Sequence, residues 1–186
     1  MEKLAKRLMK SKNWIILDTE TTGLNDYAEL VQIGILAPNG TVLLDALVKP
    51  FDPIPPESTR IHGITDDMVA NSPTFLDLFP VIEKIVQGKE VVVYNAPYDK
   101  RILEQSYAAY DTYVLKDLNL NATWTDIMRP YAEYWGAWSD YRKSYAWQKL
   151  VNACRQQDIE IQDAHSAIGD CRLSLALIQK LAEHRP

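Results

Sequence analysis

Residues 14–24 read WIILDTETTGL, an apolar run that is followed directly by two carboxylates, Asp18 and Glu20. The run predicts a buried strand over residues 13–18. Side chains alternate across a strand, so residues i and i+2 point to the same face. Two neighbouring carboxylates at a buried strand end repel each other strongly unless a cation lies between them. The stretch therefore predicts a site at which positive charge compensates Asp18 and Glu20.

The rest of the chain predicts an α/β domain with a mixed sheet, antiparallel at first, and helices on both faces. Apolar runs at 30–37 and 41–48 flank Asn39-Gly40, which is the strongest short-range signal for a hairpin. Residues 91–95 (VVVYN) predict a central strand. Helices are expected within residues 1–12, after Thr65, from Ser72-Pro73 with a kink or split at Pro80, and over 97–110, 123–137, 147–154 and 166–182. Residues 49–63, which hold four prolines, predict an ordered loop without regular structure.

Length and composition narrow the class of protein. The 186 residues suit a single domain over 1–186, with residues 1–12 as a short N-terminal helical extension. The net charge of -5 shows no basic face of the kind that coats long duplexes, so contact with nucleic acid is expected to be local, with cations supplying positive charge. No apolar run approaches the roughly 20 residues of a membrane helix. Cys154 and Cys171 lack metal-type spacing and are interpreted as reduced core residues of a cytoplasmic protein, with a disulfide as the less favoured alternative.

Two further acids and a histidine stand at the ends of other predicted elements. Asp99 lies in the first turn of the helix after the central strand, Asp170 lies one turn into the last helix, and His165 precedes that helix. Ligands in open α/β sheets gather at the carboxyl ends of strands. Oxygen-rich sites suit Mg²⁺ or Mn²⁺ rather than zinc, and two such ions about 4 Å apart can stabilise both oxygens of a phosphodiester displacement. A histidine is the usual base for the attacking water.

Each feature also has a plainer interpretation. The acids can be loop residues, helix-dipole partners or solvated helix positions, and His165 can be a helix-entry residue. His62 is favoured as a loop or packing histidine over a catalytic one. The aromatic stretch 135–147 (WGAWSDYRKSYAW) fits packing or base stacking equally well.

Three motifs taken together resemble a known family. Asp18-Thr-Glu20-Thr-Thr-Gly23-Leu, Asn95-Ala-Pro-Tyr-Asp99 and His165-Ser-Ala-Ile-Gly-Asp170 are similar to the exonuclease motifs of the DEDDh group. This group belongs to the ribonuclease H-like superfamily and includes the epsilon proofreading subunit of bacterial DNA polymerase, ribonuclease T and oligoribonuclease. The resemblance extends from about Trp14 to Leu181, and it implies a ribonuclease H-like, mixed five-stranded sheet.

The resemblance implies a metal-dependent 3′-to-5′ exonuclease that releases nucleoside 5′-monophosphates from DNA, single-stranded in the favoured interpretation. It implies two Mg²⁺ or Mn²⁺ ions with Asp18, Glu20, Asp99 and Asp170 as catalytic metal ligands, and His165 as general base. It further implies a substrate-binding set, with Leu24 wedged against the terminal base, that consists of Thr19, Thr22, Gly23, Leu24, His62 and Asn95. Asp126 is expected to support the site rather than to bind metal.

Three alternatives stay open at this point. One is an RNA-trimming or oligoribonuclease-like enzyme of the same fold, and another is a two-metal phosphoesterase for small nucleotides. The third is a non-catalytic nucleic-acid-binding or polymerase-accessory module. The expected partners are DNA or RNA 3′ ends, together with a polymerase or a second copy of the chain, and no membrane.

Overall fold

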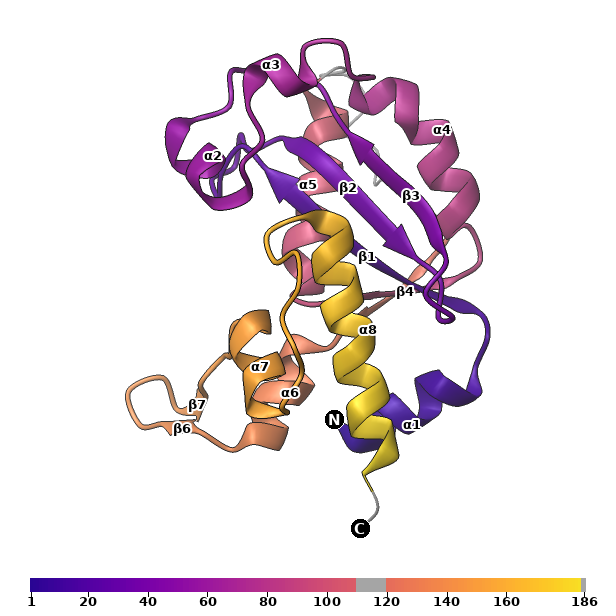
Figure 1. Cartoon of the computed structure of the whole chain (residues 1–186), viewed down its shortest axis with the longest axis vertical. Helices are drawn as coiled ribbons and strands as arrows, with labels where there is room; N and C mark the ends of the chain where they lie inside the picture. Colours follow the sequence, from indigo (N-terminus) through magenta and orange to yellow (C-terminus); the bar gives the residue numbers. More distant parts are fainter. Residues whose placement is uncertain (110–119, 185–186) are drawn as a thin grey trace.

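The computed structural model describes residues 1–109 and 120–184, and within these residues a five-stranded mixed sheet forms the centre (Figure 1). The strand order is β3-β2-β1-β4-β5. The β1–β2 and β2–β3 pairs are antiparallel, whereas β1–β4 and β4–β5 are parallel. The five strands are β1 (Trp14–Thr21), β2 (Leu30–Leu36), β3 (Val42–Leu47), β4 (Glu90–Val93) and β5 (Thr123–Asp126). The predicted hairpin, the central position of residues 91–93 and the mixed five-stranded sheet are confirmed.

Helices cover both faces of this sheet, as predicted. In Figure 1, α8 crosses in front of the sheet and α5 lies behind it. The described helices are α1 (Glu2–Lys10), α2 (Pro56–His62), α3 (Asp66–Val69), α4 (Phe75–Val86), α5 (Ala96–Ala108), α6 (Met128–Trp135), α7 (Leu150–Gln156) and α8 (Ala167–Glu183). A short separate hairpin consists of β6 (Trp138–Ser139) and β7 (Ser144–Tyr145).

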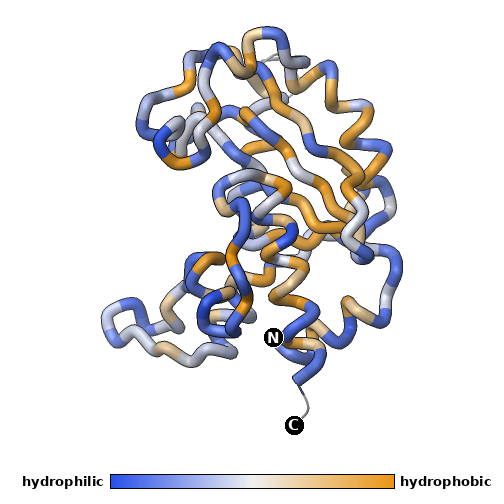
Figure 2. The backbone as a smooth tube through the Cα atoms, viewed as in Figure 1, coloured by the Kyte–Doolittle hydropathy of each residue, from blue (hydrophilic) through white to orange (hydrophobic). Residues whose placement is uncertain are grey.

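The core has two layers because β1 alternates its side chains. Ile15 and Leu17 belong to the cluster that includes α4 and α5, whereas Trp14 and Ile16 belong to the cluster with α1 and α8. Figure 2 shows the hydrophobic residues concentrated along the strands of the sheet. Cys154 and Cys171 are free and fully buried, and burial raises the pKa of the Cys154 thiol to about 12. Both thiols are therefore unreactive core groups, as their positions in the sequence suggested.

Residues 49–63 contain a helix, so the prediction of a loop without regular structure was wrong. Pro56 occupies the first position of α2, where its missing N–H costs nothing, and Gly63 ends the helix with a left-handed φ of 75°. The many prolines concealed this helix because proline is usually taken to interrupt helices. The next helix, α3, is capped by the Thr65 side chain, as predicted.

The predicted helix over residues 123–137 was also wrong in its first part. Residues 123–126 (TWTD) form β5, which pairs in parallel with β4, and the helix α6 begins only at Met128. Threonine and tryptophan fit a pleated surface well, and pairing with β4 decides the structure here. The added strand places Asp126 at the carboxyl end of the sheet.

Two helix boundaries differ from the sequence prediction, and a third cannot be compared with it. Helix α4 begins at Phe75 and is capped by Thr74 in a capping box with Asp77, rather than by Ser72, and Pro80 lies inside it without splitting it. Helix α7 begins at Leu150, so Trp147 does not belong to its apolar stripe and is 57% exposed. The predicted end of α5 at residue 110 falls outside the described residues.

The two terminal helices agree with the prediction. Helix α8 begins after Ser166, whose side chain accepts a hydrogen bond from the Gly169 N–H, and α1 packs against it (Figure 1). No helix in residues 1–109 or 120–184 has the length and apolar character that crossing a bilayer requires.

Candidate active site

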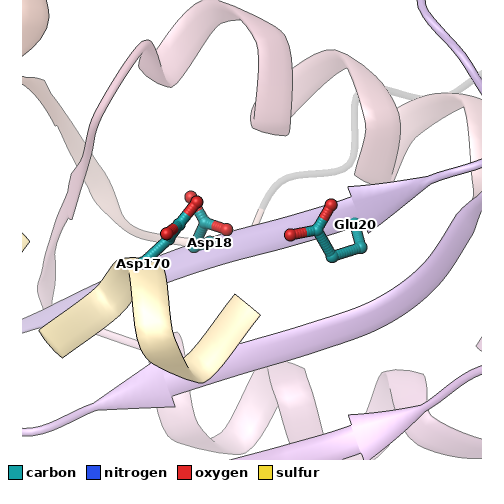
Figure 3. A group of neighbouring side chains, drawn as sticks. All are labelled: Asp18, Glu20 and Asp170. Carbon is teal, nitrogen blue, oxygen red and sulfur yellow. The ribbon is translucent and has the colours of Figure 1, made fainter. Parts of the chain in front are cut away.

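Three of the predicted acids meet at the carboxyl end of β1. Asp18 and Glu20 come from this strand, and Asp170 comes from the first turn of α8. One carboxylate oxygen from each lies within 4.8 Å of those from the other two. In Figure 3 the carboxylates of Asp18 and Asp170 face each other, and that of Glu20 extends toward them. The structure thus brings together residues that are 150 positions apart in the sequence.

The fourth acid, Asp99, lies beside this cluster in the first turn of α5. It is 3% exposed, and its Oδ1 accepts a hydrogen bond of 2.7 Å from the Thr19 hydroxyl. Its charge acts on both Asp18 and Glu20. All four predicted acids therefore share one electrostatic environment.

Burial and mutual repulsion strongly disfavour the ionised form of these four acids. Burial, together with repulsion from neighbouring acids, raises the pKa of Asp18 well above its usual range and that of Glu20 to about 8. Burial raises the pKa of Asp99 to about 7, although the hydrogen bond from Thr19 opposes the shift. Burial also raises the pKa of Asp170. A divalent cation would reverse these shifts, and a donor set made only of carboxylate oxygens fits a hard ion such as Mg²⁺ or Mn²⁺.

Close packing between β2 and α8 fixes the position of Asp170. Gly34 pairs with Asp18 across the sheet, and a Cβ atom on Gly34 would lie 2.6 Å from the carbonyl carbon of Ala167. The Gln32 side chain accepts a hydrogen bond of 3.1 Å from the Ala167 N–H, at the start of α8. Neither Gly34 nor Gln32 was predicted from the sequence as a residue of the site. A glycine inside a strand, which often marks a close backbone approach, was the available signal.

The turn after β1 is held by hydrogen bonds from Glu29, at the other end of the same loop, and from Ser58 of α2. Thr22 exchanges two hydrogen bonds with Glu29: its N–H donates to the Glu29 carbonyl, and its hydroxyl accepts from the Glu29 N–H. The Ser58 hydroxyl of α2 donates to the Thr22 carbonyl oxygen. Thr22, one of the predicted substrate-binding residues, is thereby tied to the residue that precedes β2 and to α2.

Helix α5 holds the tip of the same turn. The Tyr98 hydroxyl donates to the Gly23 carbonyl oxygen at 2.7 Å, and Arg101 Nη2 donates to the Leu24 carbonyl oxygen at 3.1 Å. The Leu24 side chain is 79% exposed although its backbone is anchored. This apolar side chain therefore projects from a fixed support.

His62 and Asn95 lie in different settings. The His62 Nδ1 accepts from the Ile64 N–H, so its Nε2 carries the proton and donates to the Thr21 carbonyl oxygen at 3.2 Å. Burial lowers the pKa of His62, which favours this neutral ring. Asn95 has a left-handed φ of 79°, and its backbone N–H donates to Asp126 Oδ1 at 2.9 Å. Asp126 thus supports the backbone next to the acids, in the way the sequence analysis expected.

His165 lies at the exposed rim of the cluster. Its backbone N–H lies 3.4 Å from Asp170 Oδ1, and this contact partly opposes the rise that burial causes in the pKa of Asp170. Its φ of 68° is left-handed, and among the described residues its ring makes no hydrogen bond. The predicted base is therefore next to the acids, with its ring free to meet solvent.

A sheet of this topology with an acidic cluster at its carboxyl edge is typical of a metal-dependent nuclease. Comparison with known proteins agrees, since residues 15–178 match the family model described as RNase_T exonuclease. The chain belongs to this exonuclease family and is a hydrolytic enzyme, which confirms the resemblance to the DEDDh group.

Relatives differ in how much of their length the chain covers. The uncharacterized exonuclease CP81 of Escherichia phage 186 is 39% identical over 186 residues, which cover 94% of this chain and 93% of the relative. The DNA polymerase III subunit epsilon of Pasteurella multocida is 32% identical over 117 residues, which cover 58% of this chain and 43% of the relative. The chain thus matches nearly all of the phage protein but less than half of the epsilon subunit.

Solved structures show the same fold. Exonuclease X in complex with 5′ overhanging duplex DNA has a TM-score of 0.66 at 24% identity, and the match covers 90% of each chain. Escherichia coli exonuclease I in complex with a dT13 oligonucleotide has a TM-score of 0.70 at 18% identity, covering 92% of this chain and 41% of that one. These matches confirm the ribonuclease H-like sheet predicted from the sequence.

Proposed function

We propose that this chain is a metal-dependent 3′-to-5′ exonuclease that hydrolyses the terminal phosphodiester bond of single-stranded DNA and releases nucleoside 5′-monophosphates. The observation that carries the proposal is the cluster of Asp18, Glu20 and Asp170, with oxygens within 4.8 Å of one another and Asp99 beside them. Such a concentration of buried acids needs compensating cations. Membership of the exonuclease family supports the reaction class.

The four acids, Asp18, Glu20, Asp99 and Asp170, would hold two Mg²⁺ or Mn²⁺ ions. When bound, such a pair of ions lowers the pKa of a water and stabilises the charge that develops on the phosphate oxygens. The protein contributes orientation. The Thr19 hydroxyl donates a hydrogen bond to the Asp99 carboxylate and fixes its orientation. Thr19 therefore acts on the substrate indirectly, by positioning Asp99. The backbone contact between His165 and Asp170 keeps the histidine beside the acids.

His165 is proposed as the general base that takes the proton from the attacking water. An imidazole can accept a proton near neutral pH, and this ring is exposed at the rim, where it can meet a water. The left-handed backbone of His165 is a sparsely populated conformation for a residue with a side chain. Such strain is often found where a side chain must be aimed for function.

The turn formed by Thr22, Gly23 and Leu24 is proposed to receive the 3′-terminal nucleotide. Leu24 offers an exposed apolar surface on an anchored backbone, so it can pack against the terminal base. Asn95 directly precedes α5, the helix that carries Asp99 in its first turn, and its side-chain amide is proposed to contact the substrate. His62 uses both ring nitrogens on the backbone, so it acts on the substrate by positioning the turn.

DNA is the favoured substrate because two structural neighbours of this fold are described as DNA complexes, one of them with the single strand dT13. A role in DNA proofreading beside a polymerase is supported by the epsilon-subunit relatives, whereas nothing observed supports a homodimer. The free, buried thiols support a reducing, cytoplasmic setting. We further propose that residues 1–186 act as one exonuclease domain, since α1 packs on α8.

The proposal is tested by a gel time course on a 5′-labelled, single-stranded DNA 20-mer. With Mg²⁺ or Mn²⁺ we expect a ladder that shortens from the 3′ end, and with EDTA we expect an intact band. Asp99→Asn should abolish the ladder, whereas the matched control Glu83→Gln, an exposed acid of α4, should leave it unchanged. An intact band with both metals, or cleavage at internal positions, would contradict the proposal. Faster degradation of an RNA copy would favour the RNA-trimming alternative.

A further inference from the structure

Residues 135–147, here called the aromatic hairpin, form a surface that the acidic cluster does not use. In this hairpin Trp138 pairs with Tyr145, and Ser139 pairs with Ser144. Figure 1 shows β6 and β7 extending away from the central sheet, beyond α6 and α7. The hairpin therefore presents its side chains to solvent instead of adding to the core.

Its aromatic rings are unusually exposed. The exposed fractions are 44% for Trp135, 54% for Trp138, 96% for Tyr141, 38% for Tyr145 and 57% for Trp147. The rings are nevertheless ordered against each other: Trp138 stands edge-on to Tyr145, with centroids 5.3 Å apart, and the Arg142 guanidinium lies 6.0 Å from the centre of the Trp147 ring. Pre-arranged, exposed aromatic faces are the feature on which proteins stack unpaired bases.

The surface around these rings is positive, in contrast to the chain as a whole. Residues 129–149 contain four cationic and two acidic side chains, although the net charge of the chain is -5. The cations are Arg129, Arg142, Lys143 and Lys149. All four are exposed, and within the described residues none forms a salt bridge. Cations without acidic partners are available to phosphates.

A groove of about 330 Å³ lies between α6 and the hairpin, lined by Arg129, Ala132, Glu133, Ser144, Tyr145 and Trp147. Two sets of hydrogen bonds link the elements around the groove to the residues that precede α5. Asp126 accepts hydrogen bonds from the backbone N–H groups of both Asn95 and Arg129, at 2.9 and 3.2 Å. The Tyr94 hydroxyl donates to the Gln148 carbonyl oxygen at 2.8 Å. The start of α6 and residue 148, directly after the hairpin, are thus fixed to the residues between β4 and α5, the helix that carries Asp99.

We propose that the aromatic hairpin binds the substrate strand upstream of its 3′ end, with bases stacked on Trp147 and Trp138 and phosphates held by Arg142 and Lys143. This inference rests on the proposed function, because it takes a single strand as the substrate. The positive charge and the combination of rings with arginine favour a nucleic acid over a protein partner. In Figure 2 the hairpin is mostly blue and pale, unlike the apolar face that a stable protein interface usually buries.

Substrate length provides the sharpest test. We would measure kcat/KM with Mn²⁺ on single strands of 2, 4, 8, 12 and 20 nucleotides, for the wild type, Trp147→Leu and Trp147→Phe. Leucine keeps apolar bulk but removes the stacking face, whereas phenylalanine keeps the face. For Trp147→Leu we expect unchanged activity on the dinucleotide and a loss of about tenfold on the 20-mer, expressed in KM. Trp147→Phe should recover most of this loss.

Binding without catalysis separates this inference from the proposed function. We would measure the anisotropy of a labelled 20-mer in EDTA, where hydrolysis is absent, over a range of salt concentrations. Arg142→Ala with Lys143→Ala should reduce the salt slope by roughly 0.7 for each lost phosphate contact. Lys10→Ala, an exposed cation of α1, is the matched control and should change nothing.

Two results would overturn the inference. One is equal affinity of Trp147→Leu and the wild type for the 20-mer in EDTA. This result would indicate that the aromatic hairpin binds a protein partner instead of the substrate strand. The other is a loss that is equally large on the dinucleotide, which would show a structural effect. Absent hydrolysis by the wild type would refute the proposed function alone, since the binding experiment still decides the role of the hairpin.

Discussion

Asp18 and Asp99 are held on a strand and a helix within the packed body of the protein, whereas His165 lies exposed in the segment before α8. Asp99 is 3% exposed and hydrogen-bonded by Thr19, while the His165 ring has no hydrogen-bond partner among the described residues. Groups that repel one another stay together only on a rigid support, because relaxation would separate them. A group that exchanges protons with water must instead reach solvent. The two halves of the site therefore meet different physical demands.

The largest effect is expected from Asp18→Asn. Removing this carboxylate should lower turnover by orders of magnitude, because the cluster loses a metal ligand. In the metal-free protein the same change should raise the melting temperature, since burial and three neighbouring acids disfavour the Asp18 charge. Thermal unfolding in EDTA beside a turnover assay measures both effects. A variant that loses stability in EDTA would contradict the repulsion on which the account depends.

His165→Ala should come next, with kcat reduced by about 10²- to 10⁴-fold through loss of the base. The stabilisation that Mn²⁺ confers on thermal unfolding should survive, because the ring lies at the rim rather than among the acids. Measuring kcat together with the Mn²⁺-dependent shift in melting temperature distinguishes the two roles. Loss of the metal-dependent shift would mean that His165 is a ligand.

Gly34→Ala tests the support beneath the acids. Its Cβ would lie 2.6 Å from the Ala167 backbone, so α8 must move and carry Asp170 away from Asp18. We expect about 1–3 kcal/mol of destabilisation, typical of overpacking, and a fall in turnover of about tenfold. Gly23→Ala is the control for stability, because a Cβ there meets nothing within 4 Å. Equal melting temperatures for the two variants would refute the close packing.

The last prediction concerns the stability of the metal-free protein alone, as a function of pH. Glu20 has a pKa of about 8 in the folded protein against a usual value of 4.5, so between these values the folded state binds more protons than the unfolded state. Stability must therefore fall as the pH rises from about 4.5 to 8, and Asp99, with a pKa of about 7, contributes in the same direction. Melting curves in EDTA across this range should show the decline. A melting temperature that rises from pH 5 to 8 would contradict the shifted pKa values.

The contrast between the rigidly held acids and the exposed histidine also explains which parts of the site could be predicted from the sequence. Asp18 and Glu20 were predictable because two residues on one strand keep their relation in any fold that contains the strand. Predicting that Asp99 and Asp170 join them required only the assumption that the starts of their two helices lie at the carboxyl edge of the sheet. The exposure of the His165 ring depends on a left-handed backbone that nothing in a histidine dictates.

Other features depended on tertiary contacts and were missed. Residues 123–126 form a strand because β4 offers them hydrogen bonds, although the neighbouring pattern suggested a helix. The roles of Gln32 and Gly34 depend on α8, which is more than 130 residues away in the sequence. The exposure of Trp147 was not predictable either, because its spacing from Leu150 and Cys154 matched a helix that in fact begins later.

The most direct test of the central claim, that the four acids hold two divalent cations, is the number of Mn²⁺ ions bound per chain. An electron paramagnetic resonance titration that distinguishes free from bound Mn²⁺ gives this number without any turnover. We predict two ions for the wild type at pH 8 and a reduced number for Asp18→Asn. A wild-type chain that binds none, or an Asp18→Asn variant that binds as many as the wild type, would contradict the account.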